Sequence, residues 1–290
     1  MDLELLLEAV IAGLLLGGFY AALSLGLAIA FGLLDVPHIA HPAFALVGAY
    51  GAVLLQGRFG LDPVLAGLIL AVPFYFFGTA VYRFYHMTFE RRGTDAGLRG
   101  LAFFFGVAFV AEVALILAFG IDQRGVRAAY IGRALILGDF RLPWRMIVAS
   151  GVALVVAGAM MLWLSRTYVG RAVQAVAQDA TALSLVGADP VRVKRIAFGV
   201  ATASVALSGA LLVVVGPVEP NMARIYIGKV FAIVVLAGLG SISGTVLAAL
   251  LLGVVESLML SSTAASWTPA VGFGLLLAVL ALKPQGLFGR

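Results

Sequence analysis

Long apolar segments make up most of the chain, and a polar, basic stretch interrupts them near the middle. We predict an all-helical, polytopic integral membrane protein with about eight or nine membrane segments, forming a single transmembrane domain over residues 1–290. The segment 226–240 is short for a full crossing and ends in glycines, so it either spans the membrane or is re-entrant. Apolar runs of helix length lie at residues 9–33, 38–57, 61–84, 100–120, 143–164, 191–216, 226–240, 243–262 and 267–283.

The polar stretch at residues 165–190, called the polar segment below, has the periodicity of an amphipathic helix. Small and apolar residues fill the positions between polar ones. Gly187 is a natural helix stop, and Asp189 followed by Pro190 predicts an N-cap and a first-turn proline for the next helix. We therefore expect a helix that lies outside the membrane. Its polar positions, spaced three and four residues apart, are Arg171, Gln174, Gln178 and Thr181.

Composition supports the membrane assignment and excludes several classes of site. Hydrophobic residues make up 63% of the chain and charged residues 11%, with a mean hydropathy of +1.11. The absence of cysteine excludes disulfides, thiolate metal sites and cysteine nucleophiles. The net charge of +5 belongs to loops that flank lipid. We therefore expect membrane lipid, and no nucleic acid, as a partner.

The distribution of lysine and arginine favours one orientation. If the polar segment is cytoplasmic, the loops on that side hold more basic residues than those on the other side, to which Arg224 and Lys229 are assigned. We therefore expect the N-terminus outside and the C-terminus in the cytoplasm. The acidic start of the chain, with Asp2, Glu4 and Glu8, differs from a secretory signal, so the first apolar segment is expected to remain as a helix.

Known catalytic motifs are absent from the sequence. Gly228 and Lys229 are followed by Val230, without the serine or threonine of a nucleotide-binding loop. Neither a serine elbow nor a His-Glu-x-x-His zinc pattern is present. We expect no catalytic residue and no cofactor bound by this chain.

Asp35, His38 and His41 lie three residues apart in a break between two apolar segments, next to Pro37 and Pro42. Three interpretations stay open: a metal site, a polar helix break that lines a substrate path, or a purely structural break. A metal site of this kind needs a further ligand, and no other cluster in the sequence offers one. We therefore expect no metal here and place the three residues at a helix break.

Two glutamates, Glu112 and Glu256, lie well inside apolar segments. An unpaired charge in a bilayer is expensive, so such residues mark a pathway, a proton relay or a buried pair. The alternative is a protonated or hydrogen-bonded packing residue. Glu256 has the better case for function because it follows a glycine-rich break by about four helical turns.

Three separated groups of residues, together with the end of the chain, form a recognisable pattern. The first group is 20–27, 31–32, 38–42 and 48–50. The second is Gly170, Arg171, Ala172, Ala175, Asp179, Ala182 and Gly187. The third is Phe231, 238–244 and 253–256, and the chain closes with 284–290.

This pattern resembles the permease subunits of ABC importers for branched-chain amino acids, amides and urea, specifically the smaller of the two paired permeases. It brackets nearly the whole chain in the expected order. The chain departs from the family at residues 38–42, where Asn-Phe-Ala-His-Gly is usual. It also departs at Gln174, where arginine is usual, and at Ala237 and Ser243 in the glycine-rich run.

The resemblance implies two sets of functional residues. The second group would dock on an ATPase, and a translocation path would run past the two helix breaks. The coupling set is Gly170, Arg171, Ala172, Ala175, Asp179 and Gly187. The path set is His38, His41, Pro42, Gly238, Gly240, Ser241, Gly244 and Glu256.

The resemblance also implies partners and a location. A second homologous permease would share the translocation path, two cytoplasmic ATPases would hold ATP and Mg, and an extracytoplasmic binding protein would deliver the solute. The complex would lie in a bacterial inner membrane and import amino acids or related small polar solutes by alternating access.

Two rival functions remain open. An ion-coupled secondary transporter would use Glu112 or Glu256 as its coupling site and would give the polar segment no special role. A non-transporting membrane scaffold would make the polar break at Asp35 to His41 incidental. Dependence of uptake on a separate ATPase distinguishes the first rival, and uptake of a small polar solute distinguishes the second.

Overall fold

The computed structural model describes residues 3–92, 96–137, 140–262 and 267–289, and most of these are helical. A short β-hairpin is the exception, with Leu135 opposite Leu142 in its antiparallel register. The elements are α1 (Leu3–Gly32), α2 (His41–Phe59), α3 (Pro63–Thr88), η1 (Glu90–Arg92), α4 (Ala96–Phe119), β1 (Ala134–Leu137), β2 (Phe140–Pro143), α5 (Trp144–Arg166), α6 (Tyr168–Gln178), α7 (Ala180–Leu185), α8 (Pro190–Val215), η2 (Pro220–Met222), α9 (Ala223–Ala237), α10 (Ile242–Ser262) and α11 (Thr268–Leu282).

Each of the nine predicted apolar segments corresponds to one helix. In the part of the chain that the structure describes, seven helical stretches are long and apolar enough to cross a membrane: residues 4–32, 63–88, 97–119, 144–166, 190–215, 220–237 and 242–262. α2, which has polar residues at both ends, and α11, which has 15 residues, are not among these seven. The all-helical membrane fold is therefore confirmed. Residues 220–237 reach spanning length only because η2 extends α9.

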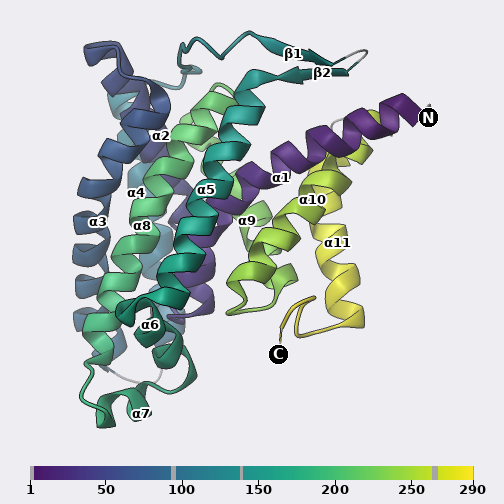
Figure 1. Cartoon of the computed structure of the whole chain (residues 1–290). Helices are drawn as coiled ribbons and strands as arrows, with labels where there is room; N and C mark the ends of the chain where they lie inside the picture. Colours follow the sequence, from purple (N-terminus) through teal and green to yellow (C-terminus); the bar gives the residue numbers. More distant parts are fainter. Residues whose placement is uncertain (1–2, 93–95, 138–139, 263–266, 290) are drawn as a thin grey trace.

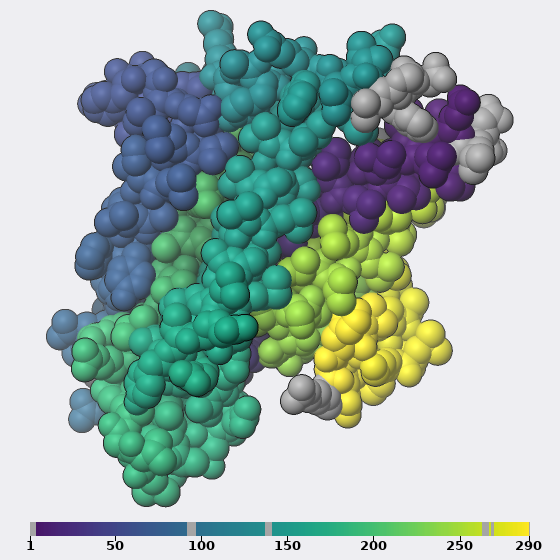
Figure 2. Space-filling view, viewed as in Figure 1, coloured from purple at the N-terminus to yellow at the C-terminus, as the bar shows by residue number. Residues whose placement is uncertain are grey.

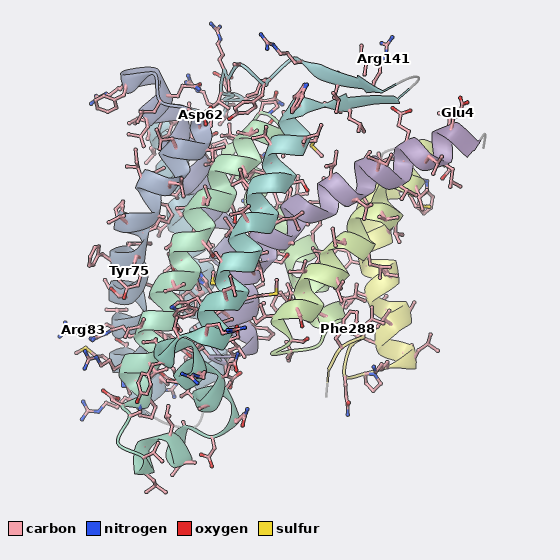
Figure 3. All side chains as sticks on the ribbon, in the orientation of Figure 1. Glu4, Asp62, Tyr75, Arg83, Arg141 and Phe288 are labelled. Carbon is pink, nitrogen blue, oxygen red and sulfur yellow. The ribbon has the colours of Figure 1, made fainter. Side chains whose placement is uncertain are left out.

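The helices form a bundle with distinct ends (Figure 1). The hairpin and the N-terminus lie at one end, and α6 and α7 lie at the other. α3, α5 and α8 run roughly along the bundle, whereas α1 crosses it obliquely and pairs with α10 (Figure 1). The side-chain view places Asp62, Arg141 and Glu4 at the hairpin end (Figure 3).

α8 and α1 form the centre of the bundle, because 83% of the apolar 18-residue stretch of α8 and 78% of that of α1 are buried. α8 packs against α2 and α3 through small residues. A Cβ added at Gly48 of α2 would lie 2.9 Å from Ala206 Cα, and one at Gly78 of α3 would lie 2.6 Å from Thr202 Cβ. Small residues give this close approach, on which helix association in lipid depends.

α1 and α10 cross at an equally close contact. A Cβ at Gly13 would lie 2.5 Å from Val254 Cα, and one at Gly253 would lie 2.5 Å from Gly17 Cα. Because the obstructing atoms are backbone, a side chain at either glycine would force the helices apart. The glycines predicted to serve packing therefore form the main contact between the first helix and α10.

The structure corrects two predictions. The polar segment is two short helices, α6 and α7, because the Asp179 side chain caps a new helix where the single predicted helix would continue. Lys229 lies inside α9 and pairs with Glu256, so it does not belong to an outside loop. Arg224 lies in the first turn of α9.

Candidate functional site

Side-chain caps define the polar segment at the end of the bundle. Thr167 Oγ1 accepts a hydrogen bond from the Gly170 N–H at 3.0 Å and begins α6. Asp179 Oδ1 accepts from Thr181 and Ala182 at 2.8 and 3.0 Å and begins α7. Asp189 then caps α8 through the Val191 N–H at 2.9 Å. The predicted N-cap of α8 is thus confirmed, and its first-turn proline is present.

The left-handed backbone of Gly187 provides the turn between α7 and α8. Its φ of +83° lies in the region that glycine adopts without strain. The predicted helix stop is therefore close to the true end of α7, which finishes at Leu185.

α6 has one face against the bundle and one face in the open. Ala172, Val173 and Val176 are buried, Ala175 is half-buried and Arg171 is exposed. At Gly170 a Cβ would lie 2.5 Å from Leu164 Cα, so α6 packs directly on the end of α5. A larger residue at Gly170 would displace the whole helix.

The exposed face of α6 and α7 combines apolar and charged side chains. Tyr168 is 75% exposed, Leu185 83% and Val186 78%. Arg171 and Asp179 are exposed beside them. Exposed apolar side chains beside charged ones are a combination that is typical of protein docking surfaces.

A cavity of about 610 Å³ brings the polar segment together with the glycine-rich turn. α6 contributes Gln174 and Gln178, and the turn between α9 and α10 contributes Gly240 and Ser241. In the space-filling view the teal surface of α5 borders the yellow-green surface of α10 (Figure 2). The remaining lining residues are Gly32, Leu33, Met161, Leu164, Ser165, Ala177, Leu239, Ile242, Ser243, Phe288 and Gly289.

Two glycines with positive φ shape this turn. Gly238 has φ +93° and Gly240 has φ +84°, so both positions favour glycine. Ser241 Oγ accepts a hydrogen bond from the Gly244 N–H at 3.2 Å and caps α10. The end of the chain packs on the same turn, since the Phe288 N–H donates to Ala237 O at 3.0 Å. Gly238 and Gly244 support the turn, whereas Gly240 and Ser241 line the cavity. Arg290 lies outside the described residues.

The other predicted break, between α1 and α2, is closed to solvent at its histidines. His41 is 0% exposed and bonds Leu23 O through Nε2 at 2.9 Å, and His38 is 2% exposed. The His38 ring lies 4.9 to 5.0 Å, centroid to centroid, from the rings of Phe44, Phe104 and Phe198.

Pro42 occupies the first turn of α2, where its missing N–H costs no helical hydrogen bond. Asp35 is exposed, with φ +56°. Within the described residues, no three His, Asp or Glu side chains are grouped to hold a metal. Neither histidine lines the cavity at the α9–α10 turn. Their role in the path thus stays a prediction.

Glu256 of α10 forms a buried ion pair with Lys229 of α9. Lys229 Nζ donates to Glu256 Oε1 and also to the Tyr20 hydroxyl of α1, the latter at 2.9 Å. The Glu256 side chain is 3% exposed and that of Lys229 is 18% exposed. The pair therefore ties three helices together inside the bundle. The sequence marked Glu256 as unusual but assigned Lys229 to a loop.

Glu112 of α4 is also paired. Arg224 donates from Nε at 3.3 Å and from a terminal nitrogen at 2.8 Å, in a two-pronged contact. The Arg224 side chain is 70% exposed, so this pair lies at the surface of the bundle. Both intramembrane glutamates thus have cationic partners on α9.

A further cluster escaped the sequence reasoning because its members are far apart in the chain. Glu90 of η1 accepts hydrogen bonds from Tyr82 and His86 of α3 at 2.8 Å each and from Lys194 of α8 at 2.7 Å. We call these four residues the Glu90 cluster. Burial alone would raise the pKa of Glu90, but the bonds from Lys194 and His86 and the charge of Lys194 lower it below its ordinary value. The spacing of Tyr82, His86 and Glu90 at intervals of four was a usable signal.

Comparison with known proteins gives a consistent result. A family model described as a branched-chain amino acid transport system permease component matches residues 9–280. The chain is 26% identical over 294 residues to the high-affinity branched-chain amino acid transport system permease protein BraD of Pseudomonas aeruginosa. The aligned region covers 98% of this chain and 96% of that protein. A stretch of 53 residues is 40% identical to the corresponding permease protein LivH of Salmonella typhimurium, over 18% of this chain and 17% of that protein.

No solved structure matches the chain at a significant level. The family match begins within α1 and ends within α11, so it includes both helix breaks and the polar segment. With this extent of agreement, and with the membrane helices that the structure shows, the chain belongs to the family of branched-chain amino acid transport system permease components.

Proposed function

We propose that the protein is a transmembrane permease subunit of an ATP-driven importer for branched-chain amino acids or related small polar solutes. The family match and the similarity to BraD support this substrate class. The chain carries no nucleotide-binding loop, so ATP and Mg bind to partner subunits. It acts by alternating access rather than by covalent chemistry.

The observation that carries the proposal is the exposed face of the polar segment. α6 and α7 are capped at both starts, are packed on α5 through Gly170, and expose Tyr168, Arg171 and Leu185 away from the bundle. A segment that is rigidly held on one side and exposes apolar and charged groups on the other is suited to receive force from a docked ATPase.

Three kinds of partner follow from this function. Two cytoplasmic ATPases dock on the polar segment, and a second homologous permease completes the translocation path. An extracytoplasmic binding protein supplies the solute at the hairpin end of the bundle. The polar segment is then cytoplasmic, which places the C-terminus in the cytoplasm and the protein in the inner membrane.

Within this chain the translocation path passes the α9–α10 turn and the α1–α2 break. Gly240 and Ser241 face a cavity large enough for a small solute, and backbone groups freed at a broken helix can bind polar ligands. His38, His41 and Pro42 shape the path indirectly in this conformation, because both imidazoles are buried and that of His38 packs against aromatic rings.

Reporter fusions test the orientation. A reporter after Arg290 and another near Thr94, which lies outside the described residues, should face the cytoplasm, and one near Gln123 should face outside. A cytoplasmic reporter at Gln123 together with an external one at Arg290 would overturn the orientation.

The decisive experiment reconstitutes the chain in proteoliposomes with its partner permease, its ATPases and the binding protein, and measures leucine uptake. Uptake should require ATP and should persist when ion gradients are collapsed. Uptake driven by an ion gradient without the ATPases would instead support a secondary transporter, and no uptake of any small polar solute would support a scaffold.

A variant of the docking face sharpens this test. Arg171→Glu should leave membrane abundance unchanged but reduce transport, because reversing an exposed charge costs the fold little and disturbs a charged interface. Arg83→Met is the matched control, since Arg83 is exposed on α3 and points away from the bundle (Figure 3). Unchanged substrate-stimulated ATP turnover in the Arg171→Glu complex would count against docking at this face.

A further inference from the structure

The Glu90 cluster lies beside the polar segment but belongs to other helices. Glu90 follows α3 in η1, and Lys194 lies in the first turns of α8, soon after the Asp189 cap. α7 connects to α8 through the short turn at Gly187, so one route by which a movement of the polar segment enters the bundle is the start of α8, where Lys194 lies. Lys194 in turn contacts Glu90, which follows α3.

The cluster joins α8 to α3 at that end of the bundle. The two carboxylate oxygens of Glu90 have different partners. Oε1 accepts a hydrogen bond from Lys194 Nζ, and Oε2 accepts hydrogen bonds from the Tyr82 hydroxyl and His86 Nδ1. An ionised carboxylate only accepts hydrogen bonds, so all three partners act as donors. Bonds of 2.7 to 2.8 Å to a charged group are short and directional.

Burial makes this contact more than a surface ion pair. Tyr82 is 0% exposed, and the side chains of Glu90, Lys194 and His86 are between 18% and 24% exposed. Exposed pairs contribute little because water competes for both charges. Here two donors of α3 hold one partly buried carboxylate in place, and Lys194 joins the carboxylate to α8.

The rest of the α3–α8 contact extends this link into the membrane. Above the cluster, Gly199 of α8 packs against Tyr75 of α3, where an added Cβ would lie 2.9 Å from the ring. Gly78 packs against Thr202 in the same interface. α3 and α8 therefore form one closely packed pair whose end nearest the polar segment is fastened by Glu90 and Lys194.

We propose that Glu90 and Lys194 are positioning residues that fasten α3 to the base of α8, so that a displacement of the polar segment moves α3 and α8 together. This inference rests on the proposed function, because it specifies how movement at the docking face reaches the bundle. This role requires no contact of either residue with the solute or the ATPase. Their role is mechanical, and removing the link should uncouple ATP hydrolysis from transport without abolishing hydrolysis.

A spectroscopic experiment tests the link without requiring transport. The chain has no cysteine, so Ser184→Cys in α7 and Arg91→Cys in η1, both exposed positions, can be spin-labelled without removing other thiols. In the purified chain the distance between the labels should give one narrow distribution. Adding Lys194→Met should broaden it, whereas Lys194→Arg, which keeps the charge, should leave it narrow. A narrow distribution in Lys194→Met would overturn the proposal.

A functional experiment completes the test in the assembled complex. Solute transported per ATP hydrolysed should fall roughly fivefold or more in Lys194→Met, a size typical of coupling between linked sites. Arg83→Met is the control for loss of a positive charge at this end and should keep the ratio of the unmodified complex. If Lys194→Met does not fold, Tyr82→Phe, which removes one of the three donors, should lower the ratio in the same direction.

The outcomes separate the two proposals. A normal ratio in Lys194→Met, or a proportional fall of transport and hydrolysis that follows the amount of folded protein, would overturn the positioning role. If the unmodified complex shows no ATP-driven uptake, the proposed function fails, and the label distances still decide whether Glu90 and Lys194 form the link.

Discussion

Replacing Glu256 with leucine should destabilise the bundle strongly, while replacing both Glu256 and Lys229 should not. Glu256→Leu leaves the Lys229 ammonium inside the bundle with only the Tyr20 hydroxyl as partner. Breaking a buried pair costs about 3 to 5 kcal/mol. Because Lys229 keeps 18% side-chain exposure and one hydrogen bond, we expect the lower end, about 3 kcal/mol, which is roughly two decades in the unfolding equilibrium constant.

The double variant Glu256→Leu with Lys229→Met removes both charges and supplies apolar side chains of similar size. Its cost should be within about 1 kcal/mol of zero, because a buried ion pair and a well-packed apolar pair are often equivalent. The coupling energy from the complete mutant cycle should therefore be large. Arg83→Met, which removes the charge of an exposed arginine on α3, should cost under about 0.5 kcal/mol and serves as the control.

Reversible unfolding in mixed micelles, followed by the far-ultraviolet circular dichroism of the helices, measures Glu256→Leu, Lys229→Met, the double variant and the control. The reasoning is refuted if Glu256→Leu alone costs less than about 1 kcal/mol. It is also refuted if the double variant is as unstable as the single one, since the cost would then come from packing of the glutamate itself rather than from the unpaired charge.

Three further predictions follow from other contacts. Gly253→Leu should prevent the α1–α10 contact and sharply reduce the amount of folded protein in the membrane. Gly158→Ala, where no atom lies within 4 Å of the added Cβ, should leave that amount unchanged. Immunoblotting of membranes compares the two variants, and equal abundance contradicts the packing argument. The pKa of Glu90 is lowered in the folded state, so the stability that ionised Glu90 contributes is complete above the unfolded pKa of about 4.3 and is lost as the pH falls through the lower folded pKa. Melting temperatures measured against pH should therefore show an acid-sensitive component that Glu90→Gln lacks. Identical pH profiles for the two proteins would argue against this contribution. His41→Ala should impair uptake beyond any loss of protein, because it removes the imidazole bound to Leu23 O at the start of α2; a loss of uptake in proportion to protein would make the residue purely structural.

Much of the fold could be predicted because the hydrogen bonds of a membrane helix join residues that are close in the sequence. Every apolar segment became a helix, since a bilayer leaves the backbone few other ways to satisfy its hydrogen bonds. The caps of α8 followed from Asp189 and Pro190 for the same local reason. The division of the polar segment was missed because Asp179 was considered only as part of the family pattern, although aspartate competes for backbone N–H groups and so begins helices.

The contacts between helices could not be predicted from one sequence. Lys229 was assigned to a loop because its partner Glu256 lies on another helix, and only their proximity makes a lysine tolerable there. The Glu90 cluster was missed because Lys194 is distant in sequence from the α3 residues that it joins. The meeting of Gln174 with Gly240 around one cavity likewise depends on packing that hydropathy does not encode.

The close contact between α1 and α10 has a consequence for the synthesis of the protein. α1 is made first, yet the backbone against which Gly13 and Gly17 pack belongs to one of the last helices to leave the ribosome. During the intervening time this glycine face must be covered by lipid, by the insertion machinery or by a temporary neighbour. A chain that ends before α10 would keep that face without its partner permanently.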